Sequence, residues 1–504
     1  MNDSKIKNIV ILGGGTAGWM AANLLHKKWQ HLGIQVTVVE SPDIGIIGVG
    51  EGSTPLLKVF FDSLDIEESE WMPACNATYK NGISFVDWST VAGYESYFHP
   101  FPTSLDFATF GFLYKYSALR RQGLDLLAHP NRFSLLANLT EKRLAPLPAE
   151  SFPFHFQYGY HFDSVLIGKF LRERAKEKGI IHIEATVESV EQHDNGDIKS
   201  LKLNTEQDLS ADFFVDCSGF ASILIQKTLK VRFLPFAENL FNDSAIAVPT
   251  EIDPNLPSET VSTALSNGWV WKIPLTNRFG NGYVYSSQYT TPDEAEIELR
   301  THLGILESDA EARHLKMKVG RTEQTWCKNC VAIGLSQGFI EPLEATALQF
   351  VYSTIDEFST AFEEGEFTNQ YREDFNDRMN KNFEGIRDYI VLHYKTNSRI
   401  DTQYWIDNRE NQNLSDNLKE MLNVWYGVED LEAALTRLNI GQYYSQRSWT
   451  CLLAGMGIFP RQENLSVADE ANLQAAQSDL DYVDNFLSGC SLNFQPHARV
   501  LVSD

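Results

Sequence analysis

The hydrophobic pattern of the first forty residues predicts a strand, a turn, a helix and a second strand. Residues 9–12 and 36–39 are uninterrupted runs rich in valine and isoleucine, which are typical of parallel strands covered on both faces. Between them, residues 13–18 are rich in glycine, and residues 17–29 have the composition of a helix. This order predicts a βαβ unit at the start of the chain.

Later segments predict more of the same sheet. Residues 187–190 and 198–203 alternate as strands do, and Asn195-Gly196 between them predicts a hairpin. Residues 213–219 read as a buried strand that runs into a glycine turn, and residues 330–335 return to sheet. Pieces of one nucleotide-binding unit are therefore expected over two-thirds of the chain.

After Glu344 the pattern becomes helical, with apolar residues three and four positions apart. We interpret this stripe as core: Tyr371, Phe375, Met379, Phe383, Ile386 and Ile390. A polar break at residues 401–416 is the best candidate for an exposed excursion from the fold.

Composition limits the classes of partner. The chain has 504 residues, of which 43% are hydrophobic, enough for a large core. A formal charge of -25 disfavours nucleic acid and anionic lipid as partners, because both carry negative charge. No apolar run reaches the roughly 18 residues that a membrane helix needs, and the apolar run at residues 9–12 is too short for a signal peptide. We expect a soluble, cytoplasmic protein.

Cysteine usage also favours a reducing compartment, since six cysteines are too few and too scattered for a disulfide framework. Cys327 and Cys330 form a CxxC pair, but no second pair or paired histidines stand nearby to complete a zinc site. We interpret them as structural thiols, with metal or redox use as the lesser alternative.

Gly13, Gly15 and Gly18 form a GxGxxG fingerprint between the first strand and the helix. The glycines allow a tight turn and close approach of a pyrophosphate, and the helix start offers free N–H groups. Glu40, which ends the second strand, is placed to accept a hydrogen bond from a ribose hydroxyl, so FAD or NAD fits better than NADP. A second glycine-rich turn at residues 47–55, including Gly50, favours a flavin.

Three further motifs indicate which class of dinucleotide-binding protein this is. They are Trp269-Val270-Trp271-Lys272-Ile273-Pro274, which reads WxWxIP, the run Glu341-Pro342-Leu343-Glu344, and Lys80 within Thr78-Tyr79-Lys80-Asn81. With the two glycine turns, they make the chain resemble the flavin-dependent halogenases typified by the tryptophan halogenases. The resemblance runs over nearly the whole length.

The resemblance implies a mechanism in two compartments. Reduced FAD, oxygen and a halide give hypohalous acid, which crosses a tunnel to an aromatic substrate. Lys80 would activate this oxidant, either by hydrogen bonding to its oxygen or as a haloamine. Glu344 would take a proton from the arenium intermediate or orient the oxidant.

The same resemblance implies the binding residues. FAD would be held by the two glycine turns and neighbouring side chains: Gly13, Gly15, Thr16, Ala17, Gly18, Glu40, Gly50, Val187, Leu335 and Leu348. Halide would bind the backbone N–H groups of Thr346 and Ala347. This chain has Glu344-Ala345-Thr346-Ala347 where tryptophan halogenases have Glu-Ser-Thr-Gly, which leaves the choice among chloride, bromide and iodide open.

For the substrate, His99 and Phe101 fall where the family sandwiches an indole. Tyr443, Tyr444 and Trp449 would add to this pocket, and Trp269 and Trp271 would separate the flavin from the substrate. The residues that clamp the amino-acid part of tryptophan do not align, so we expect indole or another small aromatic. A carrier-tethered substrate stays open.

We therefore predict an α/β fold with a Rossmann-like FAD-binding unit interwoven with a mainly helical substrate unit. The FAD unit is predicted at 1–90, 160–230 and 325–360, and the substrate unit at 91–159, 231–324 and 361–504. A single fingerprint implies reduction of FAD by a separate NAD(P)H-dependent flavin reductase. Homodimer formation stays open. The alternatives are an FAD-dependent aromatic monooxygenase and a flavin-binding protein without halogenase turnover.

Overall fold

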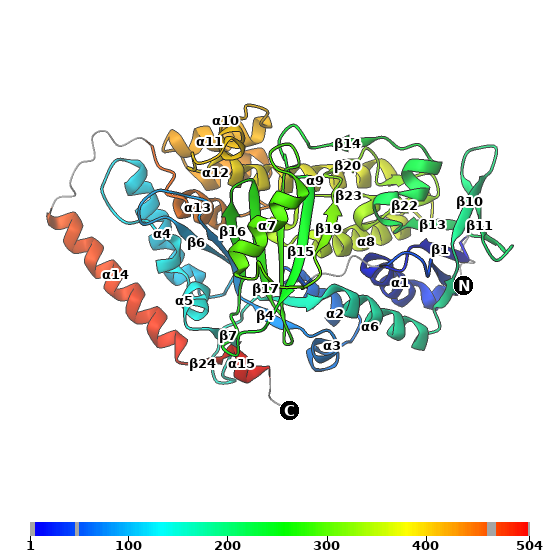
Figure 1. The fold of residues 1–504 in the computed structure, drawn as a ribbon, viewed down its shortest axis with the longest axis horizontal. Coiled ribbons are helices and arrows are strands. Elements are labelled where there is room, and N and C mark those ends of the chain that lie inside the picture. Colours follow the sequence, from blue (N-terminus) through cyan, green and yellow to red (C-terminus); the bar gives the residue numbers. More distant parts are fainter. Residues whose placement is uncertain (1–5, 46–49, 461–469, 502–504) are drawn as a thin grey trace. The chain divides into compact units, whose positions relative to one another are not determined.

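A computed structural model describes residues 6–45, 50–460 and 470–501 (Figure 1). The chain divides into two compact units of three segments each. Unit 1 comprises 1–77, 162–237 and 317–384, and unit 2 comprises 78–161, 238–316 and 385–504. This division places Lys80 in unit 2, whereas the sequence prediction assigned it to the FAD-binding segments.

Unit 1 is built on a six-stranded sheet in the order β21-β22-β13-β1-β2-β9, parallel except for β21. The strands are β1 (Asn8–Leu12), β2 (Gln35–Glu40), β9 (Ile181–Glu184), β13 (Phe213–Asp216), β21 (Trp326–Cys327) and β22 (Cys330–Ala332). Four residues of β1 and all of β13 are buried, as the β-branched runs predict for a sheet covered on both faces.

Helices of unit 1 cover this sheet. Helix α1 (Thr16–Trp29) packs against α6 (Ser164–Glu177) and α8 (Ala347–Glu364). The unit also holds α2 (Leu56–Ser63), α3 (Glu68–Ala74) and two small sheets formed by β10 (Val187–Gln192), β11 (Ile198–Leu203) and β12 (Asp208–Ser210), and by β14 (Phe233–Pro235), β20 (Gly320–Thr322) and β23 (Gly338–Phe339). The βαβ unit and the hairpin at Asn195-Gly196 are confirmed.

Unit 2 contains a seven-stranded sheet in the order β19-β15-β18-β17-β16-β5-β6. Its strands are β5 (Gly82–Val86), β6 (Ser96–Pro100), β15 (Ser244–Thr250), β16 (Thr260–Leu265), β17 (Gly268–Pro274), β18 (Phe279–Tyr285) and β19 (Arg313–Lys316). All pairs are antiparallel except β16 with β5. Strand β4 (Thr78–Lys80) precedes β5 and pairs instead with β8 (Gly159–Asp163).

Helices of unit 2 include α4 (Asp106–Arg121), α5 (Leu135–Glu141), α7 (Pro292–Leu303), α11 (Asp416–Tyr426), α12 (Leu431–Leu438), α13 (Gln446–Gly455), α14 (Glu470–Ser491) and α15 (His497–Val500). Strands β7 (Leu144–Pro148) and β24 (Phe494–Pro496) form an antiparallel pair, and α14 packs on α5. One buried apolar cluster joins α4, α5 and α14 through residues such as Leu113, Leu136 and Val483.

The helical stripe after Glu344 is confirmed except at its first residue. Helix α9 (Arg372–Lys395) buries Phe375, Met379, Phe383, Ile386 and Ile390, whereas Tyr371 precedes the helix and is half-buried. The prediction that residues 401–416 form an exposed loop is wrong. Helix α10 (Gln403–Glu410) forms there and buries Tyr404 and Trp405, so two adjacent aromatics anchor a segment whose other residues are mostly polar.

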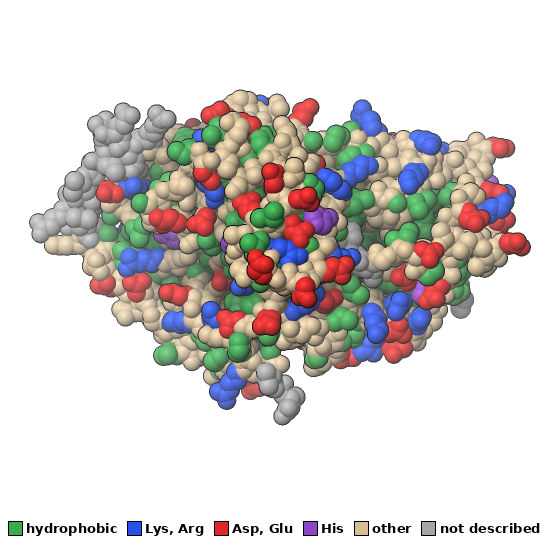
Figure 2. All heavy atoms as spheres, viewed as in Figure 1, with side chains coloured by type: hydrophobic (Ala, Val, Ile, Leu, Met, Phe, Trp, Pro, Cys, Tyr) green, Lys and Arg blue, Asp and Glu red, His purple; other side chains and the backbone are tan. Residues whose placement is uncertain are grey.

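Surface charge in Figure 2 is mixed, with acidic and basic side chains interspersed over the visible face. Among the described helices, none is long and apolar enough to cross a membrane. All six cysteines are free thiols. Within the described ranges, no group of three or more His, Cys, Asp or Glu residues could hold a metal ion, and Cys327 and Cys330 simply face each other across the β21–β22 turn.

Candidate active site

The glycine turn in unit 1 is shaped by close backbone contacts. Gly13 has a φ of +119°, and a Cβ there would lie 2.1 Å from the carbonyl oxygen of Cys217, so only glycine fits. A Cβ on Gly18 would lie 1.9 Å from the carbonyl oxygen of Gly13. A Cβ on Gly15, by contrast, would meet no atom within 4 Å. The turn therefore packs tightly on its protein side and leaves open space at Gly15.

The start of α1 follows directly from this turn. Gly15 is the N-cap, and it supplies no side chain to accept from the first amides, which leaves donors for a ligand. Thr16 donates from Oγ1 to the carbonyl oxygen of Ser164 (3.3 Å). Gly334 lies against the Ala17 side chain, because a Cβ on Gly334 would come within 2.8 Å of the Cβ of Ala17. The turn that contains Leu335 therefore lies next to the start of α1.

Glu40 lies beside the glycine turn, because a Cβ on Gly14 would come within 2.1 Å of its carboxyl carbon. The Oε2 atom of Glu40 is 3.0 Å from Nε2 of His182 and 3.9 Å from the guanidinium of Arg172. The carboxylate is thus oriented next to the turn by two neighbouring groups. These features fit an adenine dinucleotide such as FAD at the sequence-predicted place.

The second glycine turn is described from Gly50 onward, and the first part of the predicted turn, residues 46–49, lies outside the described residues. Gly50 and Glu51 belong to β3 (Gly50–Gly52). Burial raises the pKa of Glu51 to about 7, a hydrogen bond with Ser164 opposes this, and the charge of Asp163 adds to it. A carboxyl that is half-protonated near neutral pH therefore stands in the turn that the sequence assigned to the flavin.

The Glu341-Pro342-Leu343-Glu344 run enters helix α8 through a single helical turn. Glu341 and Glu344 are both buried, and Ala345 has a left-handed φ of +55°. Thr346 is the N-cap of α8 without a side-chain cap bond, and Ala347 is the first helical residue. This start of α8 presents backbone N–H groups of the kind that bind anions. Two other predicted FAD-binding residues also belong to unit 1. Leu348 is buried in the first turn of α8, and Val187 is the first residue of β10.

In unit 2, Lys80 ends β4 and is 0% exposed. Its Nζ lies 5.6 Å from the ring centroid of Phe101. Lysine is rarely fully buried in proteins, so this ammonium is held inside the unit at a cost that a surface lysine does not carry. His99 is on strand β6, which belongs to the seven-stranded sheet of the same unit, and is also buried.

The structure joins His99 to the C-terminal aromatics through Tyr389, which sequence reasoning missed. The ring centroids of His99 and Tyr389 are 5.9 Å apart. Tyr389 stacks on Tyr444 at 3.6 Å and meets Trp449 edge-on at 5.8 Å. The signal for Tyr389 in the sequence was its place next to Ile390, inside the helix that the apolar stripe predicts. Tyr443 packs over Gly385, since a Cβ there would lie 2.2 Å from its ring.

Trp269 and Trp271 occupy alternate positions of β17 and are both buried, with ring centroids 6.3 Å apart. They share one face of the strand, as their spacing predicts. Trp271 pairs across β18 with Gly282, where a Cβ would lie 2.1 Å from the indole. The glycine makes room for the Trp271 ring.

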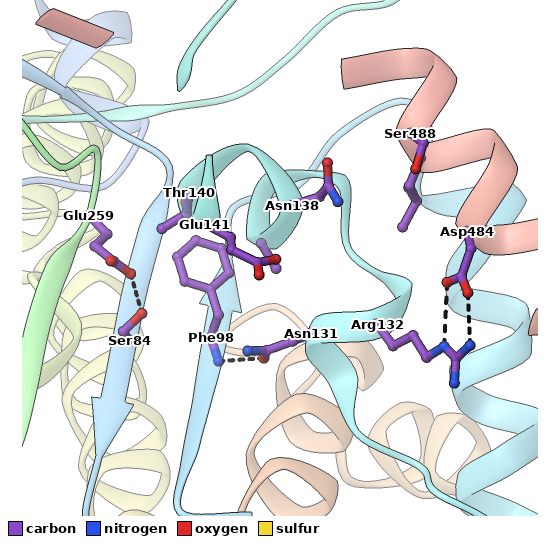
Figure 3. Close-up of a pocket in the computed structure, with 12 residues that line it drawn as sticks. Ser84, Phe98, Asn131, Arg132, Asn138, Thr140, Glu141, Glu259, Asp484 and Ser488 are labelled. Carbon is purple, nitrogen blue, oxygen red and sulfur yellow. Dashed lines mark hydrogen bonds and ion pairs between the residues drawn. The ribbon is translucent and has the colours of Figure 1, made fainter. Parts of the chain in front are cut away.

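A separate cavity of about 420 Å³ lies in unit 2 (Figure 3). It is lined by Ser84 of β5, Phe98 of β6, Glu259 and an Arg132–Asp484 ion pair. Ser84 and Phe98 are directly opposite each other, whereas His99 is opposite Ile83. Because strand faces alternate, this cavity is on the other side of β5 and β6 from His99.

Comparison with known proteins places these features in a family. The tryptophan halogenase family model matches residues 8–472. The chain is 36% identical to tryptophan 6-halogenase SttH of Streptomyces toxytricini, with 94% of both chains covered. It is 35% identical to tryptophan 7-halogenase RebH of Lentzea aerocolonigenes, with 90% of both chains covered.

Solved structures agree. A crystal structure of SttH matches with a TM-score of 0.83 over 98% of this chain and 99% of that one. BrvH, a flavin-dependent halogenase from Brevundimonas sp. BAL3, matches at 32% identity with a TM-score of 0.83 and 99% of both chains covered. The α/β fold is thus that of the flavin-dependent halogenases, and the chain belongs to the tryptophan halogenase family.

Proposed function

We propose that this chain halogenates an electron-rich, indole-type aromatic with hypohalous acid, and that Lys80 delivers the halogen. The observation that carries the proposal is the complete burial of Lys80, with its ammonium facing the ring of Phe101. A buried cation next to an aromatic wall suits a group that must meet an oxidant and a flat substrate away from bulk water.

FAD would be held by residues of unit 1. The pyrophosphate would meet the open space at Gly15 and the first amides of α1, including those of Thr16 and Ala17. Glu40 would accept from a ribose hydroxyl. Gly50, Val187, Leu335 and Leu348 would complete the site. When bound, reduced FAD would supply the electrons that convert O2, halide and protons into hypohalous acid and water, which leaves the FAD oxidised.

Halide would be held by the backbone N–H groups of Thr346 and Ala347 at the start of α8. The methyl group of Ala347 stands where tryptophan halogenases have glycine, so the preference of this chain among chloride, bromide and iodide is to be determined by experiment. Hypohalous acid then gives its halogen to the ring carbon, and the displaced aromatic proton leaves with the hydroxide as water.

Lys80 would donate a hydrogen bond to the oxygen of hypohalous acid, which makes the halogen more electrophilic, or carry the halogen as a haloamine. Glu344, buried in unit 1, would take the aromatic proton or orient the oxidant. His99 and Phe101 would hold the substrate ring, with Tyr443, Tyr444 and Trp449 beyond them. Trp269 and Trp271 would keep the substrate from the flavin.

Reduction of FAD would require a separate NAD(P)H-dependent flavin reductase, as the single dinucleotide fingerprint suggests. The experiment is mass spectrometry of products from the purified protein with FAD, a generic flavin reductase, NADH and oxygen. Chloride, bromide and iodide are each tested with indole, tryptophan and phenols. A halide mass shift supports the proposal and ranks halides and substrates together. Oxygen insertion without halide would support a monooxygenase instead.

A further inference from the structure

A buried chain of hydrogen bonds crosses the strand that carries Lys80. Strand β4 pairs antiparallel with β8, so Thr78 faces His161 and Lys80 faces Gly159. Because residues alternate along a strand, Thr78 and Lys80 project to the same side of β4 as His161 does from β8. The side chains of Thr78 and His161 are both fully buried.

The directions of these bonds follow from the number of protons available. Thr78 Oγ1 donates its one hydrogen to the carbonyl oxygen of Pro274 (2.8 Å). The 3.0 Å contact between Thr78 Oγ1 and His161 Nδ1 therefore requires that the ring donates from Nδ1.

The other ring nitrogen of His161 completes the chain. Burial, followed by the positive charge of Lys80, holds the pKa of His161 well below its usual range. The ring is therefore neutral, and Nε2 accepts from the hydroxyl of Thr260 at 3.0 Å. The chain runs from Thr260 of β16 through His161 and Thr78 to Pro274, the last residue of the WxWxIP motif on β17.

The opposite edge of β4 is also held. His497 of α15 accepts from the backbone N–H of Tyr79 through Nε2 (3.1 Å) and donates from Nδ1 to the carbonyl oxygen of Pro257 (2.9 Å). Burial lowers the pKa of His497 to about 4, so this ring is neutral as well. After Lys80, Asn81 donates from Nδ2 to the hydroxyls of Ser258 (2.9 Å) and Thr140 (3.1 Å).

We propose that His161 is a positioning residue for Lys80: through Thr78 it fixes the lysine-bearing strand to the end of the WxWxIP strand. The inference rests on the proposed function of Lys80. A buried polar network is costly unless every member is paired, but when paired it specifies one arrangement. An ammonium that must meet a small oxidant has to be held to within about 0.5 Å.

The test distinguishes the hydrogen bond of His161 Nδ1 to Thr78 from that of Nε2 to Thr260. In His161→Asn the side-chain amide reaches about as far as Nδ1, so it can still donate to Thr78. In His161→Gln the amide reaches about as far as Nε2 and serves Thr260 instead. Thr78→Val removes the hydroxyl at constant shape, and Thr78→Ser keeps it as a second, milder variant. The matched control is His129→Asn. His129 is another histidine of unit 2, and its ring donates a hydrogen bond to the carbonyl oxygen of Ser96, which belongs to β6 rather than to β4.

We expect His161→Asn, Thr78→Ser and His129→Asn to keep kcat within about threefold of the wild type. His161→Gln and Thr78→Val should lower kcat by about tenfold or more with KM and FAD affinity unchanged, because Lys80 is misplaced while binding is intact. A smaller share of the NADH consumed should then appear as halogenated product. Equal kcat values and equal yields for His161→Asn and His161→Gln would overturn the inference.

Amide hydrogen exchange provides a readout that does not need turnover. The peptide that contains β4 should exchange faster in Thr78→Val and His161→Gln than in the wild type, His161→Asn and His129→Asn. If the wild type yields no halogenated product, the proposed function fails, and the exchange result still decides whether His161 positions β4. Unchanged exchange of β4 in Thr78→Val and His161→Gln would overturn the positioning itself.

Discussion

Lys80 is fully buried, and its ammonium lies 5.6 Å from the ring centroid of Phe101. A lone lysine is usually a solvated surface charge, so only the surrounding motif pointed to Lys80, and its burial is a finding of the structure. His161 was missed because a histidine in a short apolar strand reads as core. Its partners Thr78 and Thr260 are 83 and 99 residues away in the chain, and only the fold brings them together.

Glu51 gives a residue-scale prediction about pH. Its pKa rises from the ordinary 4.5 to about 7 in the folded chain, so the folded state holds this proton more tightly than the unfolded state. This contribution to stability is full below pH 4.5 and declines until the pH passes about 7. The glutamine of Glu51→Gln cannot ionise, so this variant does not lose stability in this way as the pH rises.

The measurement is Tm by differential scanning calorimetry of the two apo proteins across this pH range. The difference in Tm, Glu51→Gln minus wild type, should increase from the acidic end and level off above about pH 7. A difference that is constant with pH would show that Glu51 titrates normally. Glu307→Gln, on an exposed residue, serves as the control.

Elements with a strong local pattern were predicted well. The βαβ unit and helix α9 follow from periodicity and glycine chemistry, which act over short distances. The segment at residues 401–416 was mispredicted because its polar composition dominated the reading. Tyr404 and Trp405 nevertheless bury their rings, and Nε1 of Trp405 donates to the carbonyl oxygen of Leu265 (2.7 Å), a tertiary contact that no local pattern encodes.

The glycine turn before α1 gives an element-scale prediction. Gly15→Ala adds a methyl group into space where the protein has no atom within 4 Å, so the fold should tolerate it. If that space receives the FAD pyrophosphate, FAD affinity should fall by about tenfold or more at nearly unchanged Tm. Gly111→Ala, which also meets no atom within 4 Å but lies on α4, is the control.

Flavin fluorescence titration and thermal melts report both quantities. Wild-type FAD affinity in Gly15→Ala would mean that the cofactor does not approach this turn. A large fall in Tm would show instead that the methyl group disturbs the protein, as we expect for Gly13→Ala, whose Cβ would collide with the backbone at Cys217.

For the whole molecule, scattered sheet segments correctly indicated that the chain is interwoven, since each unit consists of three segments. Boundaries were harder to predict because the chain passes between units within continuous elements such as α9. Overall similarity also leaves the site of halogenation undecided, because a 6-halogenase and a 7-halogenase are nearly equally similar to this chain.

The need for a separate reductase gives a prediction for the whole molecule. Because the chain has one dinucleotide fingerprint, NADH alone with FAD should support no turnover. A flavin reductase of any source, or FAD reduced chemically with dithionite and added with oxygenated buffer, should each support halogenation. Turnover with NADH and FAD alone, in protein shown free of contaminating reductase, would contradict this prediction.

The most direct test of the account is the halide-dependent mass shift of an indole substrate in the wild type, Lys80→Ala and Lys272→Ala, an exposed lysine of the WxWxIP motif. FAD binding is measured in parallel. The account predicts halogenated product in the wild type and Lys272→Ala, and a rate at least about a thousandfold lower in Lys80→Ala with FAD bound as in the wild type. Halogenation by Lys80→Ala at the wild-type rate would contradict the central claim.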